Sequence, residues 1–185
     1  TSGSLGLGYS HLALDAASLA TDQGAGGYGT AGGSARGLLS LSHRQRLAAA
    51  WSVQLTFNAQ VAARNLSSSD KMSLGGAQGV RAYPSGEAAG DDAWLGTAEV
   101  HYAGFGAQGL RLFGFYDRGR SWASHEPLPT DVNVMRTLHG GGVGAHWYPT
   151  DRLRVTGSVA WRGSEAARSE PDRPWRAWVE VSQSF

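Results

Sequence analysis

The sequence predicts an all-β fold, and more narrowly a segment of a transmembrane antiparallel β-barrel. Polar and apolar residues alternate with period two in several stretches, which is the pattern of strands with two different faces. Very short and long connections alternate between these stretches. Glycine (27 residues) and aromatic residues (7 Trp, 6 Tyr and 5 Phe) are abundant, as in proteins built from strands and turns. The slightly negative mean hydropathy is compatible with a membrane barrel, because lipid-facing and interior residues alternate along its strands.

The first third of the chain contains three candidate strands. Two weaker candidates cover residues 5–14 and 35–46. The third, over residues 51–61, alternates most cleanly. Its apolar odd positions are Trp51, Val53, Leu55, Phe57, Ala59 and Val61, and its polar even positions are Ser52, Gln54, Thr56, Asn58 and Gln60. Such a strand presents one apolar and one polar face.

Five further candidate strands follow. Residues 93–103, 109–117 and 138–148 alternate less regularly, whereas residues 152–162 and 175–185 again separate apolar from polar positions. The apolar face of the last strand carries Trp175, Ala177, Val179, Val181 and Phe185. The sequence thus predicts about eight strands of roughly ten residues each. This length is enough for a tilted strand to cross a bilayer.

The connections between the candidate strands differ in length. Two are very short, at Thr150-Asp151 and Phe105-Gly106-Ala107. The long ones are rich in Gly, Ser, Pro and acidic residues and cover residues 15–32, 65–92, 118–137 and 163–173. Short turns at one rim and long loops at the other are typical of outer-membrane barrels.

A soluble β-sandwich or lipocalin-like barrel is the alternative fold, and two features favour the membrane barrel over it. The polar faces carry arginines that suit a water-filled interior: Arg36, Arg44, Arg152, Arg154 and Arg162. The apolar faces carry aromatic residues near the strand ends, as aromatic girdles do: Trp51, Trp94, Tyr102, Trp147, Trp161 and Trp175. No run of about 18 apolar residues predicts a transmembrane helix.

The sequence predicts no catalytic, metal or cofactor site. Cysteine is absent, the six histidines lack ligand spacing, and no phosphate-binding loop is present. His139-Gly140-Gly141-Gly142 is similar to the oxyanion loop of lipases, but no Gly-x-Ser-x-Gly motif accompanies it, so we expect small residues that face the barrel interior. The net charge of +1 does not indicate nucleic-acid binding.

Phe185 ends the chain on the apolar face of the last candidate strand. A terminal aromatic residue in this phase is typical of the signal that directs outer-membrane proteins to the barrel-assembly machinery. We therefore predict that Phe185 is an assembly signal. The chain begins at Thr1, close to the first candidate strand, so we expect a further segment upstream.

Several short motifs follow one another from Phe57 to Tyr102. They are Gln60-Val61-Ala62, Asn65-Leu66, Ser69-Asp70, Leu74-Gly75-Gly76, Val80-Arg81-Ala82-Tyr83-Pro84, Gly86-Glu87-Ala88, Gly90-Asp91 and Ala98-Glu99-Val100. In this order and spacing they resemble the ShlB/FhaC/HecB family, the outer-membrane transporters of two-partner secretion. The resemblance covers most of the chain and is strongest over residues 57–122.

The resemblance implies a long loop, here residues 65–92, that folds back into the barrel interior. In this family its tip carries a Val-Arg-Gly-Phe/Tyr tetrad, and a later strand carries Phe-x-Asp-x-Gly. The matching residues are Val80, Arg81, Ala82, Tyr83, Phe115, Asp117 and Gly119. Ala82 stands where the family usually has glycine, the residue best suited to positive φ. A guanidinium held against a barrel wall needs a carboxylate, so we expect Arg81 to pair with Asp117.

The acidic residues Glu87, Asp91 and Asp92 lie in or next to this loop. They are expected to be solvated or to brace the loop rather than to serve in acid–base chemistry.

The resemblance further implies that residues 1–185 are the C-terminal half of a barrel of about sixteen strands in a Gram-negative outer membrane. The remaining strands and periplasmic POTRA domains are expected upstream. The implied function is export of a large partner exoprotein, a haemolysin, haemagglutinin or adhesin, with no bond chemistry. Outer-membrane lipid and the barrel-assembly machinery are further implied partners.

The competing hypothesis is a self-contained eight-stranded outer-membrane barrel, either an enzyme such as a lipid A deacylase or a passive anchor. The long loop 65–92 and the Phe-x-Asp-x-Gly strand favour the transporter, because neither is expected in those small barrels.

Overall fold

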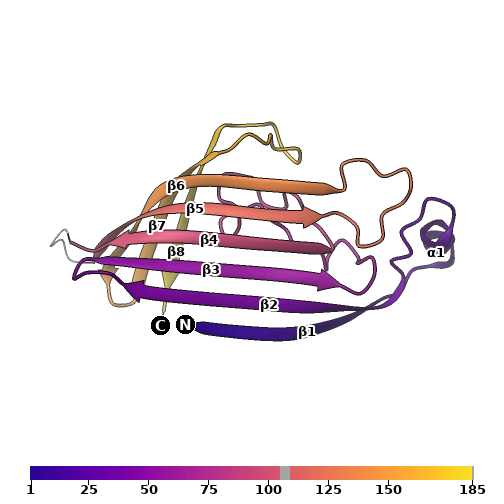
Figure 1. The fold of residues 1–185 in the computed structure, drawn as a ribbon, viewed down its shortest axis with the longest axis horizontal. Coiled ribbons are helices and arrows are strands. Elements are labelled where there is room, and N and C mark those ends of the chain that lie inside the picture. Colours follow the sequence, from indigo (N-terminus) through magenta and orange to yellow (C-terminus); the bar gives the residue numbers. More distant parts are fainter. Residues whose placement is uncertain (105–108, 185) are drawn as a thin grey trace.

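The computed structural model describes residues 1–104 and 109–184, which form one antiparallel sheet (Figure 1). Each strand pairs with the next strand in the chain, and this confirms the all-β prediction. The strands are β1 (Ser2–Leu12), β2 (Gly32–Arg46), β3 (Trp51–Ala62), β4 (Asp92–Tyr102), β5 (Leu110–Trp122), β6 (Met135–Thr150), β7 (Leu153–Arg162) and β8 (Trp175–Gln183). Phe185 and the predicted turn Phe105-Gly106-Ala107 lie outside the described residues.

A short helix, α1 (Ala16–Gln23), lies in the connection that the sequence analysis treats as a loop over 15–32. Asp15 caps it, because its carboxylate accepts a hydrogen bond from the backbone N–H of Ser18 (2.9 Å). Two turns of helix are too short to show a helical hydrophobic period, so the alternation pattern missed it. Among the described residues, no helix has the length and apolar character needed to span a membrane.

Strands β5 and β6 extend further than the alternation predicts. The connection between them covers residues 123–134 rather than 118–137. The added residues are paired in register, with Arg118 opposite His139. Glycine and serine in this stretch suggested a loop, but the ladder satisfies their backbone groups as in any strand.

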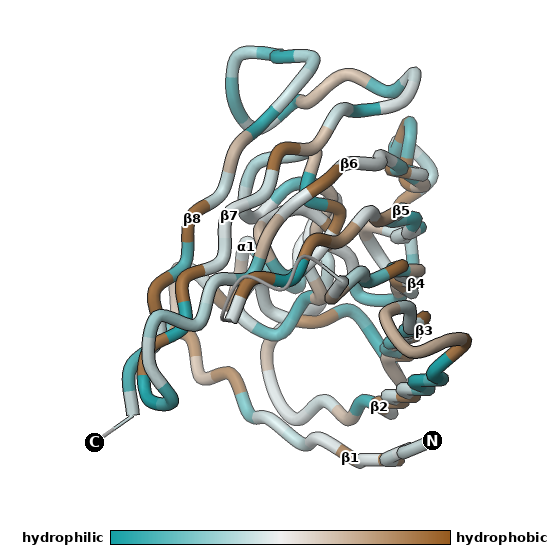
Figure 2. The backbone as a smooth tube through the Cα atoms, turned by 90° about the vertical axis from the view of Figure 1, so that its left-hand side faces the viewer, coloured by the Kyte–Doolittle hydropathy of each residue, from teal (hydrophilic) through white to brown (hydrophobic). Residues whose placement is uncertain are grey.

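The sheet is strongly curved and therefore has a convex and a concave face (Figure 2). Odd-numbered residues of β3 and β8 lie on the convex face and are exposed or partly exposed, for example Leu55 (47%) and Val179 (77%). Even-numbered residues of the same strands face the other way: Gln60 donates to the carbonyl of Asp70 (3.0 Å). The predicted phase of both strands is confirmed.

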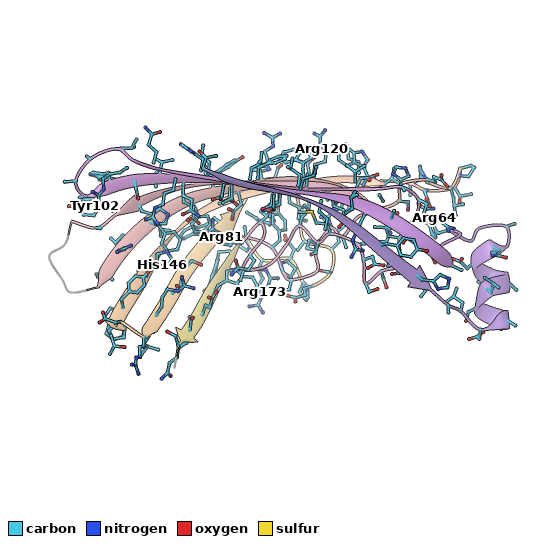
Figure 3. The ribbon with its side chains drawn as sticks, turned by 90° about the horizontal axis from the view of Figure 1, so that it is seen from below. Arg64, Arg81, Tyr102, Arg120, His146 and Arg173 are labelled. Carbon is cyan, nitrogen blue, oxygen red and sulfur yellow. The ribbon has the colours of Figure 1, made fainter. Side chains whose placement is uncertain are left out.

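The concave face is covered by the connection between β3 and β4, residues 63–91, which we call the inserted loop (Figure 3). The main buried cluster joins this loop to four strands; its members are Leu74, Val80, Ala82, Tyr83, Ala93, Leu95, Phe113, Phe115, Leu138 and Ala160. The core thus lies between one sheet and its own loop. Within the described part of the chain β1 and β8 are the two edges of the sheet, which is not closed.

The long connections leave the sheet at the same end. They are residues 13–31, 63–91, 123–134 and 163–174, whereas the turns 47–50 and 151–152 lie at the opposite end. The inserted loop is therefore surrounded at its base by the other long connections.

Candidate functional site

The inserted loop has a compact structure of its own. Near its base, Met72 and Gly90 form an antiparallel bridge. Nearer the tip, the N–H of Val80 donates to the carbonyl of Leu74 (2.7 Å), and the N–H of Tyr83 donates to the carbonyl of Val80 (3.0 Å). These bonds turn the chain at the Val-Arg-Ala-Tyr tetrad, which forms the tip of the loop.

Arg81 makes the principal polar contact between the tip and the sheet. Its Nε and Nη2 donate to the two carboxylate oxygens of Asp117 over 2.9 and 2.8 Å. Its backbone N–H donates to the same carboxylate (3.1 Å). Nη1 donates to Glu99 on the neighbouring strand (2.7 Å). We call these three residues the tip anchor; its bidentate geometry requires the planar fork of arginine.

The tip anchor is withdrawn from water. The side chain of Asp117 is fully buried, and that of Arg81 is 11% exposed. Thr97 Oγ1 donates to Asp117 (3.0 Å), and the guanidinium carbon lies 3.5 Å from the centre of the Phe115 ring. Buried ions need this full set of partners, because each loses several kcal/mol of hydration.

Sequence reasoning predicts one carboxylate for Arg81 but misses the second, Glu99. The other oxygen of Glu99 lies 3.0 Å from Nε2 of His101. The phase of the strand was the available signal, because it places Thr97, Glu99 and His101 on one polar face. That signal identifies the face but not which of the three side chains contacts the loop.

The other tetrad residues hold the tip by packing. Val80 and Tyr83 are fully buried, and the Tyr83 hydroxyl donates to the carbonyl of Glu165 (2.8 Å). Ala82 lies against Gly140, where an added Cβ would be 2.6 Å from the Cβ of Ala82. Ala82 does not have a positive φ, so alanine is accommodated there without backbone strain.

The Phe-x-Asp-x-Gly residues of β5 have three different structural roles. The Phe115 ring packs against the guanidinium, and Asp117 balances its charge. Gly119 provides space: an added Cβ would lie 2.9 Å from Cδ2 of Leu74 and 2.9 Å from the carbonyl oxygen of Trp94. All three residues face the inserted loop.

A second anchor lies at the base of the loop and centres on Glu87, which is almost fully buried. Its carboxylate accepts hydrogen bonds from the N–H (2.9 Å) and hydroxyl (2.5 Å) of Ser169 and from the N–H of Arg168 (3.1 Å), and it pairs with Arg136. Burial opposes ionisation, but these donors outweigh it and lower the pKa of Glu87 to about 2. This base anchor joins the loop to β6 and to the connection 163–174.

Asp91 and Asp92 strengthen the same end of the loop. Asp91 is fully buried, lies 3.0 Å from Nζ of Lys71 and accepts a hydrogen bond from the N–H of His125 (2.9 Å). Asp92 accepts one from the N–H of Ala62 (2.8 Å). The sequence left open whether these acidic residues are solvated or brace the loop. Their contacts are those of residues that brace it.

A polar cavity of about 410 Å³ lies beside the tip on the concave face. Its lining includes Arg81 and Glu99 of the tip anchor, Trp178 and the basic side chains Arg44, Arg111 and Arg154. The Trp178 indole N–H donates to the carbonyl of Arg81 (2.7 Å), so β8 also holds the tip. In the described part of the chain, no group of three His, Cys, Asp or Glu side chains is placed to hold a metal ion.

Known proteins with similar sequences and folds have been identified. HuxB, the "heme/hemopexin transporter protein" of Haemophilus influenzae, is 32% identical over 124 residues, covering 65% of this chain and 22% of HuxB. The structure of CdiB from Escherichia coli shares the fold with a TM-score of 0.68 at 15% identity, over 89% of this chain and 30% of CdiB. The chain thus spans about a fifth of HuxB.

A family model, "Haemolysin secretion/activation protein ShlB/FhaC/HecB", matches residues 14–147. This range includes the inserted loop, the tip anchor and the Phe-x-Asp-x-Gly strand. The description of the family names haemolysin secretion or activation, and HuxB is named as a transporter, not as an enzyme. Because the match covers well over half of the 185 residues, the chain belongs to the ShlB/FhaC/HecB family.

Proposed function

We propose that residues 1–185 are the C-terminal half of an outer-membrane barrel that exports a partner exoprotein by two-partner secretion in a Gram-negative bacterium. Membership of the ShlB/FhaC/HecB family supports this function, and so does the transporter name of HuxB. The exoprotein is of the haemolysin, haemagglutinin or adhesin type. Upstream strands and POTRA domains complete the transporter.

The observation that carries the proposal is the inserted loop docked on the concave face. An extended substrate needs a passage through the barrel, and the loop with its buried core occupies that space. A charged anchor suits a removable element better than an apolar one, because water can solvate its ions once they separate, whereas exposed apolar surface is unfavourable. The tip anchor is then the contact that opening has to break.

The polar cavity beside the tip fits the same role. Its arginines, hydroxyls and amides can form transient hydrogen bonds with an unfolded chain in passing. No nucleotide is needed, because folding of the exoprotein outside the cell draws the chain outward. Val80, Arg81, Ala82, Tyr83, Phe115, Asp117 and Gly119 serve transport by holding and releasing the loop.

The convex face is suited to lipid. At the short-turn end of the sheet, Trp51 and Tyr102 pack together with their ring centroids 4.7 Å apart. At the opposite end, Trp161 and Trp175 are paired in register and about half exposed. Aromatic side chains in two rows with an apolar band between them are typical of barrels in membranes.

The self-contained eight-stranded barrel is less well supported. Such a barrel would pair its first and last strands, whereas β1 and β8 are sheet edges in the described residues. The family match and the large inserted loop also favour a larger barrel.

The test is secretion by the full-length protein. A strain that lacks the transporter gene but produces the partner exoprotein should keep the exoprotein inside the cell. Wild-type transporter should restore export, and a variant without residues 70–90 should insert into the outer membrane but export abnormally. Export that is unchanged in the deletion strain would refute the proposed function.

A further inference from the structure

Two arginines of β5 lie on the convex face of the sheet, away from the inserted loop. Arg118 and Arg120 alternate with Asp117 and Gly119, which face the loop. In register, Arg120 lies opposite Trp94, which belongs to the outward-facing aromatic residues. Figure 3 shows Arg120 on the side of the sheet opposite to Arg81.

Neither arginine has a carboxylate partner among the described residues. Arg118 is exposed, and Arg120 donates from Nε to the hydroxyl of Thr137 (3.0 Å). Asp92 lies opposite Trp122 in register, on the same side of the sheet, but its oxygens already contact the N–H of Ala62 and Nδ1 of His125 (2.8 Å each). The two guanidinium groups therefore have free donors directed outward.

His139 lies opposite Arg118 and Thr137 lies opposite Arg120, and the positions further out are apolar or aromatic. These further outward positions carry Trp94, Ala98, Tyr116, Val143 and Trp161. In a membrane, an arginine on this face is tolerated near the interface and unfavourable at the midplane. Arg118 is four residues from Trp122, the end of β5, or about 13 Å along the strand. Both guanidinium groups can therefore reach the level of the lipid headgroups from the end of the sheet that carries the long connections.

We propose that Arg118 and Arg120 bind the phosphate groups of a phosphorylated glycolipid in the outer leaflet. This inference rests on the proposed outer-membrane location. Residues two apart on one face of a strand are about 7 Å apart, which allows the two guanidiniums to bind one phosphate together or two neighbouring phosphates. Guanidinium groups bind phosphate oxygens bidentately, and an adjacent Trp at the interface covers the sugar or the acyl-chain boundary.

The experiment compares lipid binding by full-length variants in nanodiscs. The test variant is Arg118→Gln/Arg120→Gln. The matched control is Arg44→Gln/Arg111→Gln, which removes two arginines that line the cavity on the concave face. The probes are bis-phosphorylated lipid A, lipid A without phosphates, and inorganic phosphate, with bound lipid counted by native mass spectrometry.

We expect the test variant to bind phosphorylated lipid A about tenfold or more weakly than wild type, and the control variant to bind it normally. Dephosphorylated lipid A should bind all three proteins equally and weakly, and inorganic phosphate should compete only at high concentration. Equal binding of phosphorylated lipid A by test variant and wild type would overturn the proposal. If inorganic phosphate alone binds tightly, the proposal that the bound phosphate belongs to a lipid would be overturned.

The proposed function is read out separately in the same variants, by heat-modifiability of the inserted barrel and by secretion. If the test variant inserts and secretes but retains its lipid, the lipid site is wrong and the transporter stands. If the wild-type protein neither inserts nor secretes, the proposed function itself is wrong.

Discussion

At the residue scale, the tip anchor is a cation placed between two carboxylates. Arg81 gives up most of its hydration, and the Asp117 carboxylate, fully buried, gives up all of it. The three hydrogen bonds from Arg81 to Asp117 and the one from the Thr97 hydroxyl compensate for that loss. The energetic consequence is asymmetric. The complete anchor contributes little net free energy to docking, whereas one buried ion left without its partner is strongly unfavourable.

The first prediction concerns this asymmetry. Arg81→Ala or Asp117→Ala should each destabilise the docked loop by on the order of 3–5 kcal/mol, less whatever hydration the remaining ion regains. Either should impair secretion while leaving the barrel inserted. The double variant should be little worse than either single one, because the contact is lost once. Secretion assays and heat-modifiability gels on the four proteins measure this.

Arg154→Ala is the matched control for Arg81→Ala. Its ion pair with Glu180 is long (3.4 Å) and about half exposed on both sides. Removing it should change stability by no more than about 1 kcal/mol. Wild-type secretion by Arg81→Ala, or strictly additive losses in the double variant, would show that the two anchor residues do not act as a pair.

The second prediction concerns Gly119, one of the places where the loop lies close to the sheet. Gly119→Ala would place a Cβ 2.9 Å from both a side-chain atom of Leu74 and the backbone of Trp94. We expect a loss of about 1–3 kcal/mol and partial undocking of the loop. Gly157→Ala is the control, because nothing lies within 4 Å of the corresponding Cβ. Urea denaturation of both refolded proteins tests the difference; equal midpoints would contradict it.

Residue contacts were predictable only where the sequence resemblance supplied them. The Arg81–Asp117 contact was expected from the two motifs. The roles of Glu99, Gly140 and Trp178 were not, because they depend on how the loop lies on the sheet, and strand alternation assigns only a face to each of them. Ala82 was expected to matter through its φ, but its position against Gly140 is what the structure adds.

At the element scale, the inserted loop is fixed at two separate places. The tip anchor attaches it to β4 and β5, and the base anchor attaches it to β6 and the connection 163–174. A loop held only at the tip could swing about its base. With Glu87 in place, release of the tip alone leaves the base docked.

The third prediction tests the base anchor by pH. The folded pKa of Glu87, about 2, lies below its ordinary value of 4.5. The stabilisation is therefore complete above pH of about 4.5 and is lost as the pH falls towards 2. Hydrogen exchange in residues 63–91, corrected for the intrinsic pH dependence of exchange, should accelerate over that range.

Glu87→Gln should show faster exchange already at pH 7 and a flatter response to acid, because it lacks the ionised carboxylate. Glu126→Gln, an exposed residue of another long connection, should behave as wild type. Identical pH profiles for wild type and Glu87→Gln would mean that other carboxylates hold the base of the loop.

The strands were largely predictable and their ends were not. Period-two alternation located all eight strands and gave the correct faces for β3 and β8, because each strand has one side toward the loop and one side away from it. It failed over residues 118–122, where arginines occupy an outward face that alternation expects to be apolar. The cap of α1 at Asp15 was visible, but the helix is too short for a period.

At the scale of the whole molecule, the main question is which surface meets the membrane. The convex face carries the apolar odd positions of β3, and the concave face carries the polar positions, the cavity and the inserted loop. In the proposed barrel, the first meets lipid and the second meets water.

The fourth prediction distinguishes these faces with cysteine, which the chain lacks. Leu55→Cys on the convex face should not react with a water-soluble thiol reagent in intact membranes, whereas Gln54→Cys should react. The two positions are adjacent, so they share a depth and differ only in face. Equal labelling would invalidate the assignment of the convex face to lipid.

The partners of the inserted loop lie at different places along the chain, so they become available at different times as the protein is made. The tip anchor is complete once β5 has been made, but two further partners follow later in the chain: Ser169 is 82 residues after Glu87, and Trp178 is 97 residues after Arg81. Until the connection 163–174 is in place, Glu87 lacks Ser169, and until β8 is in place, the carbonyl of Arg81 lacks its indole donor. In a chain truncated before residue 163, the tip anchor and Arg136 would hold the loop without these two partners, and we expect proteases to cleave residues 63–91 faster than in the full chain. Complete docking of the loop thus requires the last strand to be in place.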